Sequence, residues 1–446
     1  MGKGAVSQDQ DRSQALEQLP SARLVVPLLV TLLLPALYIS LRVRLLNLSL
    51  DPSELGVVTQ LQWVSLLFEI LKDSLLALAV FHLGAVHQDR VRLEARWINA
   101  LYLVAGAHAL LALLIALFDT SLLEHFAYAG LPVEHAATYL RLEAISQLPA
   151  ALMAVMQAAL LVLGKSRWLY VTAVGQLLAS ALTDSLLIPL AGNAQGQSIG
   201  WVAISPGIAA SLTLLVTLVL LHKSGFLQQT ALTPDGVGRW LLRSVPAALE
   251  CTLRNAVFAW MILRLVNVSG ESNLFWNTNQ FIWTWILLPV FALGLLVRRD
   301  AATSTSSCLQ APRFYVIGVM VCALVWIGSS SLWPDWIGLA MGYESPQAAA
   351  ALADSQIGFY LVFCIGYLLT QHFLGKGRTG VLLLNTAIVN LGYYGFAFIA
   401  YHAALWQPDL SGIVRLFGWG LVTGTVTLIL QYTWLQHRDR FVCSQP

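Results

Sequence analysis

Charged residues are scarce in this chain of 446 residues: they make up only 11% of it, whereas hydrophobic residues make up 57%. A soluble globular domain carries about 25% charged residues. The composition therefore excludes an ordinary soluble protein and indicates a protein that crosses the membrane several times. The net charge is only +2 and no basic run stands out, so we expect no nucleic-acid partner.

Cysteine is also rare, and its spacing carries no motif. The five cysteines form no CxxC pair and no pattern of metal ligands, so we expect free thiols, no metal site and no cofactor. Residues 1–22 are polar and lack the apolar segment and cleavage site of a signal peptide. We therefore expect the first membrane helix itself to direct the chain to the membrane.

Long apolar runs are abundant. A helix that crosses a bilayer needs about 20 mostly apolar residues, and twelve segments meet this requirement. They are residues 24–46, 58–84, 97–118, 138–163, 168–190, 199–221, 240–265, 275–297, 314–333, 356–375, 380–404 and 412–435. The sequence thus predicts an all-α polytopic membrane protein with 12 transmembrane helices.

The basic residues predict the orientation of these helices. If the N-terminus is cytoplasmic, most of the 25 lysines and arginines fall in cytoplasmic segments, and the opposite loops are acidic or neutral. We therefore expect both termini to lie in the cytoplasm. We further expect a monomer in the lipid bilayer of a bacterial-type inner membrane.

Two short motifs recur about half a chain length apart. They are LGAVHQDR at 83–90 with LGLLVRRD at 293–300, and LGKSR at 163–167 with LGKGR at 374–378. Each pair lies at the cytoplasmic end of corresponding predicted helices. Six helices per repeat give both halves the same orientation, so the repeat predicts two six-helix lobes related by a pseudo-two-fold axis along the membrane normal.

The repeat and the topology divide the chain into five parts. We expect a cytoplasmic N-terminal tail at 1–23, an N-lobe at 24–221, a polar cytoplasmic linker at 222–240, a C-lobe at 241–435 and a cytoplasmic C-terminal tail at 436–446. Such repeats are typical of carriers that work by alternating access.

Several stretches carry a resemblance to a known family. The stretch 139–188 begins YLRLEAISQLP, contains the turn LGKSR and ends in an acid before an aliphatic run, and 242–258 reads LRSVPAALECTLRNAVF. Together with LGAVHQDR, these resemble helices 4, 5 and 7 and the loop after helix 2 of the multidrug and toxin extrusion (MATE) family. Glu250, Arg254 and Asn255 are similar to the acid-x-x-x-Arg-Thr pattern of its DinF-like branch. The chain looks like a divergent member of this family within the multidrug/oligosaccharidyl-lipid/polysaccharide flippase superfamily.

The resemblance implies a rocker-switch antiporter, in which entry of a proton or sodium ion drives export of an organic solute. In many bacterial members, an acid in helix 1 and an acid in helix 5 form a cation site. Asp184 supplies the helix 5 acid, but Arg42 and Arg44 lie where the helix 1 acid is expected, and Ser180 replaces the usual Asn. The usual cation site is therefore incomplete.

Four carboxylates within predicted spans are candidates for cation coupling. A charged group at bilayer depth costs a few kcal/mol on insertion scales, so its presence suggests a role. The candidates are Asp184, Glu69, Asp73 and Glu250. Glu69, Lys72 and Asp73 share one helix face and alternatively hold helices together. Asp184 alternatively reaches outer water or pairs with Arg42 or Arg44.

A second set of residues is expected to line the substrate cavity. It comprises Lys72, Arg254, Asn255, Arg42, Trp283 and Asn385. Arg254 lies one helical turn after Glu250 and is expected to pair with it. Arg42 and Arg44 point to opposite sides of their helix and alternatively extend to the interface. Trp283 is a candidate for stacking on a flat solute, and the asparagines alternatively join helices.

We expect Arg141 and Glu143 to lie at the outer membrane interface.

The primary hypothesis is a secondary transporter, not an enzyme, that exports an organic solute by alternating access and uses a proton or sodium gradient. The first alternative is a flippase or exporter of an anionic or lipid-linked substrate, because the basic residues in the predicted spans balance the acids and those at the outer ends tip the charge positive. The second alternative is a non-transporting membrane scaffold derived from a carrier.

Overall fold

The computed structural model describes residues 25–443 apart from 77–82, 84–85, 87–88, 131, 164–165, 193–198, 224–236 and 304–311. The predicted tail at 1–23 lies outside the described residues.

Helices account for nearly all of the described chain. The first half contains α2 (Val25–Ser49), α3 (Pro52–Gln60), α4 (Trp63–Leu76), α6 (Arg90–Leu117), α7 (Asp119–His125), α8 (Val133–Val162), α9 (Ser166–Gly192) and α10 (Ile199–Lys223). The second half contains α11 (Val237–Phe258), η2 (Ala259–Leu263), α12 (Arg264–Ser269), α13 (Ser272–Phe281), η3 (Ile282–Ile286), α14 (Leu288–Thr303), α15 (Pro312–Ser329), η4 (Ser330–Leu332), α16 (Trp333–Trp336), η5 (Ile337–Met341), α17 (Pro346–Asp354), α18 (Ile357–Gly375), α19 (Thr379–Ala387), η6 (Ile388–Tyr394), α20 (Gly395–His402) and α21 (Leu410–Cys443).

These elements form the predicted membrane spans. In the described residues, 11 helices are long and apolar enough to cross a bilayer, and the bent pair α13–α14 brings the number to 12. The helix axis bends by 51° between the two arms of this pair, next to Leu287. The spans are, in order, α2, α3–α4, α6, α8, α9, α10, α11–α12, α13–α14, α15–η5, α18, α19–α20 and α21.

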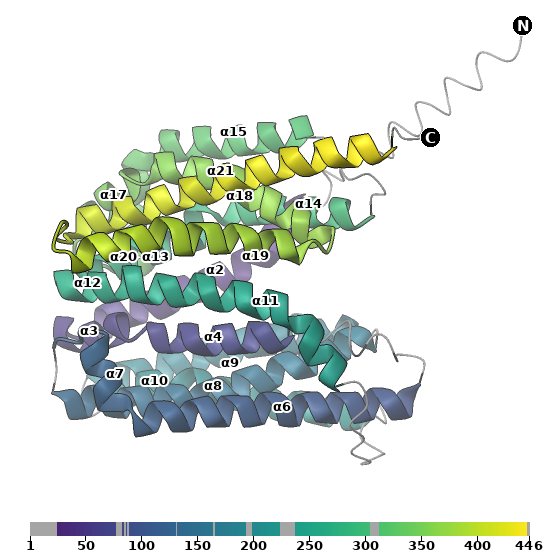
Figure 1. Ribbon diagram of the computed structural model, residues 1–446. Helices are drawn as coiled ribbons and strands as arrows, with labels where there is room; N and C mark the ends of the chain where they lie inside the picture. The colour runs from purple at the N-terminus through teal and green to yellow at the C-terminus, as the bar shows by residue number, and fades with distance from the viewer. Residues whose placement is uncertain are drawn as a thin grey trace, which may run out of the picture.

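The packing repeats between the halves when each span is matched to the sixth span after it. In the first half α2 packs on α9, α4 on α8 and α8 on α10; in the second half α11 packs on α19, α14 on α18 and α18 on α21. The lobes meet where α2 contacts α14 and where α4 contacts α11 (Figure 1). Because α2 corresponds to α11 and α4 corresponds to α14, the two contacts between the lobes correspond to each other. This fits the predicted two-fold arrangement of lobes.

Two glycines of the repeated motifs explain part of the repeat. A Cβ added at Gly375 would lie 2.4 Å from the carbonyl oxygen of Arg298, and one at Gly294 would lie 2.3 Å from the ring of Tyr367. Both glycines therefore let α14 and α18 approach closely, as small residues do at membrane helix contacts. The matching glycines of the N-lobe motifs lie outside the described residues.

We predict that Gly375→Ala destabilises the protein by about 1–3 kcal/mol, because the added methyl group overpacks a backbone contact. Gly358→Ala on the same helix is the matched control, since nothing lies within 4 Å of a Cβ there. Thermal unfolding of the purified protein in detergent compares the two. Equal midpoints for both variants would contradict the close approach at Gly375.

Hydrogen bonds between the lobes gather at the end of the bundle where α2 and α12 finish and α3 and α13 begin; we call this end the seam. Asn47 Nδ2 donates to Asn277 Oδ1 at 2.7 Å, and Thr59 Oγ1 donates to Asn273 Oδ1 at 2.7 Å. Asn267 Nδ2 reaches the carbonyl of Phe126 at 2.9 Å. Figure 1 shows α3, α7 and α12 together at this end, opposite the C-terminal end of α21.

Helices extend further than expected at the predicted linker and C-terminal tail. α10 continues to Lys223 and α11 already begins at Val237, so both enter the predicted linker, whose residues 224–236 lie outside the described chain. α21 continues to Cys443 through most of the predicted tail. Three described cysteines form no disulfide: Cys251, Cys322 and Cys364. Cys308 and the side chain of Cys443 lie outside the description.

Candidate functional site

The N-lobe holds a buried ion pair between α2 and α9. Arg42 Nη1 donates to Asp184 Oδ1 at 2.6 Å, and the Tyr38 hydroxyl donates to Asp184 Oδ2 at 2.9 Å. The Ser205 hydroxyl of α10 also donates to Oδ1. Asp184 is fully buried, whereas the Arg42 side chain is 20% exposed. Of the two arginines considered as partners of Asp184, Arg42 is therefore the one that pairs with it.

A proline explains how α10 takes part in this cluster. Pro206 lacks a backbone N–H, so the carbonyl of Val202 one turn earlier has no donor within the helix. Arg42 Nη2 donates to that carbonyl at 3.3 Å, and Arg42 Nη1 also lies 3.3 Å from Ser205 Oγ. The guanidinium thus joins three helices through one carboxylate, one hydroxyl and one freed carbonyl.

A second buried carboxylate, Glu143, lies between α8 and α4. Its Oε1 accepts hydrogen bonds from the Ser65 hydroxyl at 2.8 Å and from Gln147 Nε2 at 2.7 Å. A Cβ at Gly207 would lie 2.6 Å from Ser146 Cβ, so α10 presses closely on α8 next to this site. Glu143 is only 5% exposed. Its side chain therefore points into the lobe, and its expected place at the outer interface stays a prediction.

Arg141, also expected at the interface, forms an ion pair near the end of its helix. Arg141 Nη2 lies 2.5 Å from Asp119 Oδ2, and the Asp119 side chain is buried while that of Arg141 is 53% exposed. Residues Arg141 and Glu143 are two positions apart, so they project to different sides of α8. The arginine turns to α7 and the glutamate turns into the lobe.

The C-lobe carries the predicted pair on α11. Arg254 Nε lies 3.3 Å from Glu250 Oε1, which also accepts a hydrogen bond from Thr386 of α19 at 3.1 Å. The pairing expected from the spacing is thus present. The α11–α19 contact corresponds to the α2–α9 contact that holds Arg42 and Asp184. Both lobes therefore use the same helix pair for a polar contact, with the acid on opposite members.

The predicted face on α4 is described only in part. Glu69 is exposed and Lys72 is half-buried. Lys72 interacts electrostatically with His108 of α6, whose Nδ1 lies 2.9 Å from the Val104 carbonyl. The backbone of Asp73 belongs to α4, but its side chain lies outside the described residues.

Three candidates for the substrate cavity have partners within the C-lobe. Asn255 Nδ2 donates to the carbonyl of Cys251 in its own helix at 3.0 Å. Asn385 Oδ1 of α19 accepts a hydrogen bond from Thr427 of α21. The Trp283 indole contacts the rings of three aromatic residues, Phe291, Tyr360 and Phe363. The Asn255 contact stays within its own helix, and the Asn385 contact joins α19 to α21. Trp283 belongs to an aromatic cluster.

Arg42 and Arg44 point to different sides of α2, as their spacing predicts. Arg42 faces Asp184 within the N-lobe, whereas Arg44 Nη1 donates to the Leu339 carbonyl of η5 in the C-lobe. The side of α2 that carries Arg44 therefore contributes to the seam.

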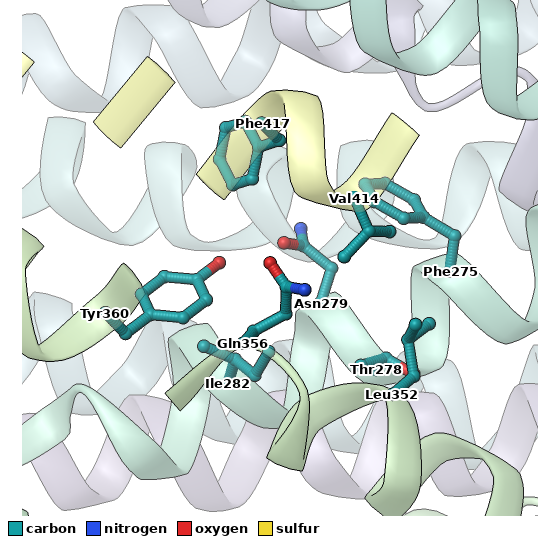
Figure 2. A pocket seen from close by; sticks show the side chains of 9 residues that line it. All are labelled: Phe275, Thr278, Asn279, Ile282, Leu352, Gln356, Tyr360, Val414 and Phe417. Carbon is teal, nitrogen blue, oxygen red and sulfur yellow. The ribbon is translucent and has the colours of Figure 1, made fainter. Parts of the chain in front are cut away.

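A small pocket lies in the C-lobe between α13, α18 and α21. Figure 2 shows the Tyr360 hydroxyl, the Gln356 amide oxygen and the Asn279 amide turned toward one another. Gln356 Oε1 is buried and has no hydrogen-bond partner among the described residues. About 20 Å³ is open to the centre of a water molecule, and about 10–15 Å³ suffices for one water. The pocket therefore has room for water and is too small for an organic solute.

Among the described residues, no group of three or more His, Cys, Asp and Glu side chains could hold a metal ion.

Comparison with solved structures identifies the fold. A multidrug resistance MATE family transporter of the MOP superfamily in its inward-facing conformation is similar with a TM-score of 0.65 and 16% identity, covering 92% of this chain and 96% of that one. The outward-facing form of such a transporter gives a TM-score of 0.64 and 16% identity, covering 94% and 95%. A MOP superfamily transporter from Pyrococcus furiosus also gives a TM-score of 0.64 and 16% identity, covering 94% and 95%. Its reported features are a reversed polarity of the binding pocket and a different suggested function.

No protein-family model and no curated protein matches the sequence. The structural similarity spans nearly the whole chain, so the protein has the fold of the MATE transporters. The prediction of an all-α membrane protein with two six-helix lobes is confirmed.

Proposed function

We propose that this protein is a secondary transporter that moves an organic solute across the membrane by alternating access. The single observation that carries this proposal is the fold, which is similar over more than 90% of the chain to both an inward-facing and an outward-facing transporter. A fold that occurs in both states suits a carrier whose lobes rock against each other.

The distribution of contacts between the lobes supports this proposal. The hydrogen bonds of Asn47, Thr59 and Asn267 hold the lobes together at the seam. If both termini are cytoplasmic in a bacterial-type inner membrane, as the basic residues predict, the seam lies at the outer side. The lobes would then be joined outside, which corresponds to the inward-facing state of the carrier.

We place cation coupling in the polar cluster around Asp184. A coupling proton or sodium ion would have to compete with the Arg42 guanidinium for this carboxylate, so exchange of these cations is the proposed coupling step. Glu250, Glu69 and Asp73 are the further carboxylates proposed for coupling, and Lys72, Arg254, Asn255, Trp283 and Asn385 remain proposed cavity residues. Buried ionisable groups of this kind commonly belong to ion pathways.

The test is transport by the purified protein in liposomes. We expect a pH or sodium gradient to drive movement of an organic dye, with ethidium as the cationic probe and carboxyfluorescein as the anionic probe. Liposomes without protein and liposomes with collapsed gradients are the controls. If neither gradient moves either dye or a wider panel of organic solutes, the protein is not a coupled transporter, and the scaffold alternative gains support.

An anionic or lipid-linked substrate is the second candidate. It is favoured by two arginines: Arg42 occupies the position expected for a helix 1 acid, and the Arg254 side chain is 59% exposed. Arginine recognises carboxylate and phosphate groups with two parallel hydrogen bonds. Preferential transport of carboxyfluorescein over ethidium, and its loss in Arg254→Gln, would favour this candidate; preference for ethidium would exclude it.

A further inference from the structure

Glu143 differs from the buried carboxylates Asp184 and Asp119, because neither of its described hydrogen bonds comes from a cation. Asp184 is bonded to Arg42 and Asp119 to Arg141, whereas Glu143 is bonded to Ser65 and Gln147. An ionised carboxylate without a cation is costly in the interior of a membrane protein. A group retained at that cost suggests that its charge changes during function.

The geometry at Glu143 suits both the charged and the neutral form of the carboxyl group. Both described hydrogen bonds end on Oε1. A protonated carboxylic acid keeps one oxygen as an acceptor and carries the proton on the other. The Ser65 and Gln147 bonds therefore persist when Oε2 takes a proton, and no bond within the chain has to break.

The groups around Glu143 favour a proton over a metal cation. Ser65 and Gln147 point hydrogen-bond donors at the carboxylate, whereas a metal ion needs several oxygen acceptors turned toward it. Within electrostatic reach lie Arg42, which is already bonded to Asp184, and Tyr139. On elements packed against α8, Asp119 pairs with Arg141, and the buried Glu94 pairs with Arg90. Lys72 is half-buried and within electrostatic reach of His108, and Glu69 is exposed.

The hydrogen bond from Ser65 connects Glu143 to the seam. Ser65 lies on α4 two residues after Trp63, whose indole stacks on Phe126 with ring centroids 4.2 Å apart. Phe126 in turn meets Trp260 of the C-lobe edge-on at 6.0 Å, and its carbonyl accepts the hydrogen bond of Asn267. A change at Glu143 is thus three contacts away from the other lobe.

We propose that Glu143 is a proton-binding site of the N-lobe, and that its protonation changes the strength of the seam through Ser65 and α4. This proposal rests on the proposed transport function. It adds a second carboxylate to the cation exchange proposed at Asp184: Glu143 alternates between −1 and 0. A proton from water binds at Oε2 of Glu143 and is later returned to water, so the net charge of this side chain changes by one in each step.

Proton binding itself is tested without any substrate. Infrared difference spectra of the purified protein at high and low pH report the C=O stretch of a protonated carboxylic acid. We expect a buried-acid band that is lost in Glu143→Gln, shifted in Glu143→Asp and unchanged in Glu134→Gln, an exposed glutamate of the same helix. A band that remains unchanged in both Glu143 variants would overturn the proposal, even if one of them folds poorly.

Transmission to the seam is tested separately. With the native cysteines replaced, cysteines at Thr59 and Asn273 are joined by a thiol-reactive crosslinker, and the crosslinking rate is followed against pH. We expect the rate to change several-fold with pH in the otherwise native protein and to be constant in Glu143→Gln. Ser65→Ala should keep the infrared band but lose the pH response. A pH response retained in Glu143→Gln would overturn the proposed link.

The two proposals fail in different ways. If liposomes containing the native protein move no solute while the infrared band behaves as expected, the transport function fails and the proton site stands. If Glu143→Gln still carries out solute movement driven by a pH gradient at the native rate, the transport function stands and Glu143 is not its proton site.

Discussion

Asp184→Asn is expected to lower the free energy of unfolding by about 3–5 kcal/mol, because it leaves the half-buried Arg42 guanidinium without its counter-charge. The carboxylate is fully buried and accepts three hydrogen bonds, from Arg42, Tyr38 and Ser205. An amide at this position provides one acceptor oxygen in place of two and no charge. Unfolding in mixed micelles, followed by denaturant titration, measures the loss.

A double substitution separates the ion pair from general damage to the site. Arg42→Met with Asp184→Asn removes both charges, so we expect it to recover most of the stability lost in either single variant. Arg92→Gln is the matched control, because its 3.2 Å ion pair with Asp89 is exposed on both sides and contributes at most about 1 kcal/mol. Additive losses in the double variant would contradict a coupled pair.

Transport gives the second readout of the same variants. If Asp184 is the coupling carboxylate, Asp184→Asn abolishes gradient-driven movement of the dye, and the stabilised double variant does not restore it. This combination separates function from folding, because the double variant is stable and still inactive. Native transport by the double variant would show that the pair is structural and that Asp184 does not couple.

The sequence predicts the spans well because each is a local property. About 20 apolar residues in a row have few alternatives to a transmembrane helix, so the bounds of the predicted helices differ from the structure by only a few residues in most cases. The bend at Leu287 was not predicted, although Pro289 lacks a backbone N–H and the π-helix η3 precedes it, and both features commonly kink helices. The repeat was detected since Gly294 and Gly375 occupy close helix contacts that permit little variation.

The site was predictable only where its partners are close in sequence. Glu250 and Arg254 lie one turn apart, so their pairing follows from helix geometry alone. The partner of Asp184 is distant in sequence, and two arginines were equally possible until the fold brought α2 beside α9. The burial of Glu143 inside the lobe was not predicted, because a position near a helix end suggested contact with water. A signal was present in Gln147, one turn later on the same face, which marks a polar side directed into the lobe.

Crosslinking the seam is expected to stop transport completely and reversibly. The Thr59 hydroxyl lies 2.7 Å from Asn273 Oδ1, so cysteines at these positions are close enough for a short, cleavable crosslinker between α3 and α13. Alternating access requires the lobes to separate at one end while they close at the other, and a covalent link prevents that separation. The dye assay in liposomes should show background movement after crosslinking and native movement after cleavage.

A pair within one lobe provides the control for this experiment. Gln60 and Ala129 are joined at the same end of the molecule by hydrogen bonds of 2.6 and 2.9 Å, and both belong to the N-lobe. A crosslink between cysteines at these two positions adds the same chemistry without joining the lobes, so transport should continue. If the Thr59–Asn273 link leaves transport intact, the lobes do not need to part at the seam, and rocking of two rigid lobes is not how this protein works. If both links stop transport, motion within the N-lobe is required as well, and the α3–α4 break beside Ser65 is where that motion would be sought.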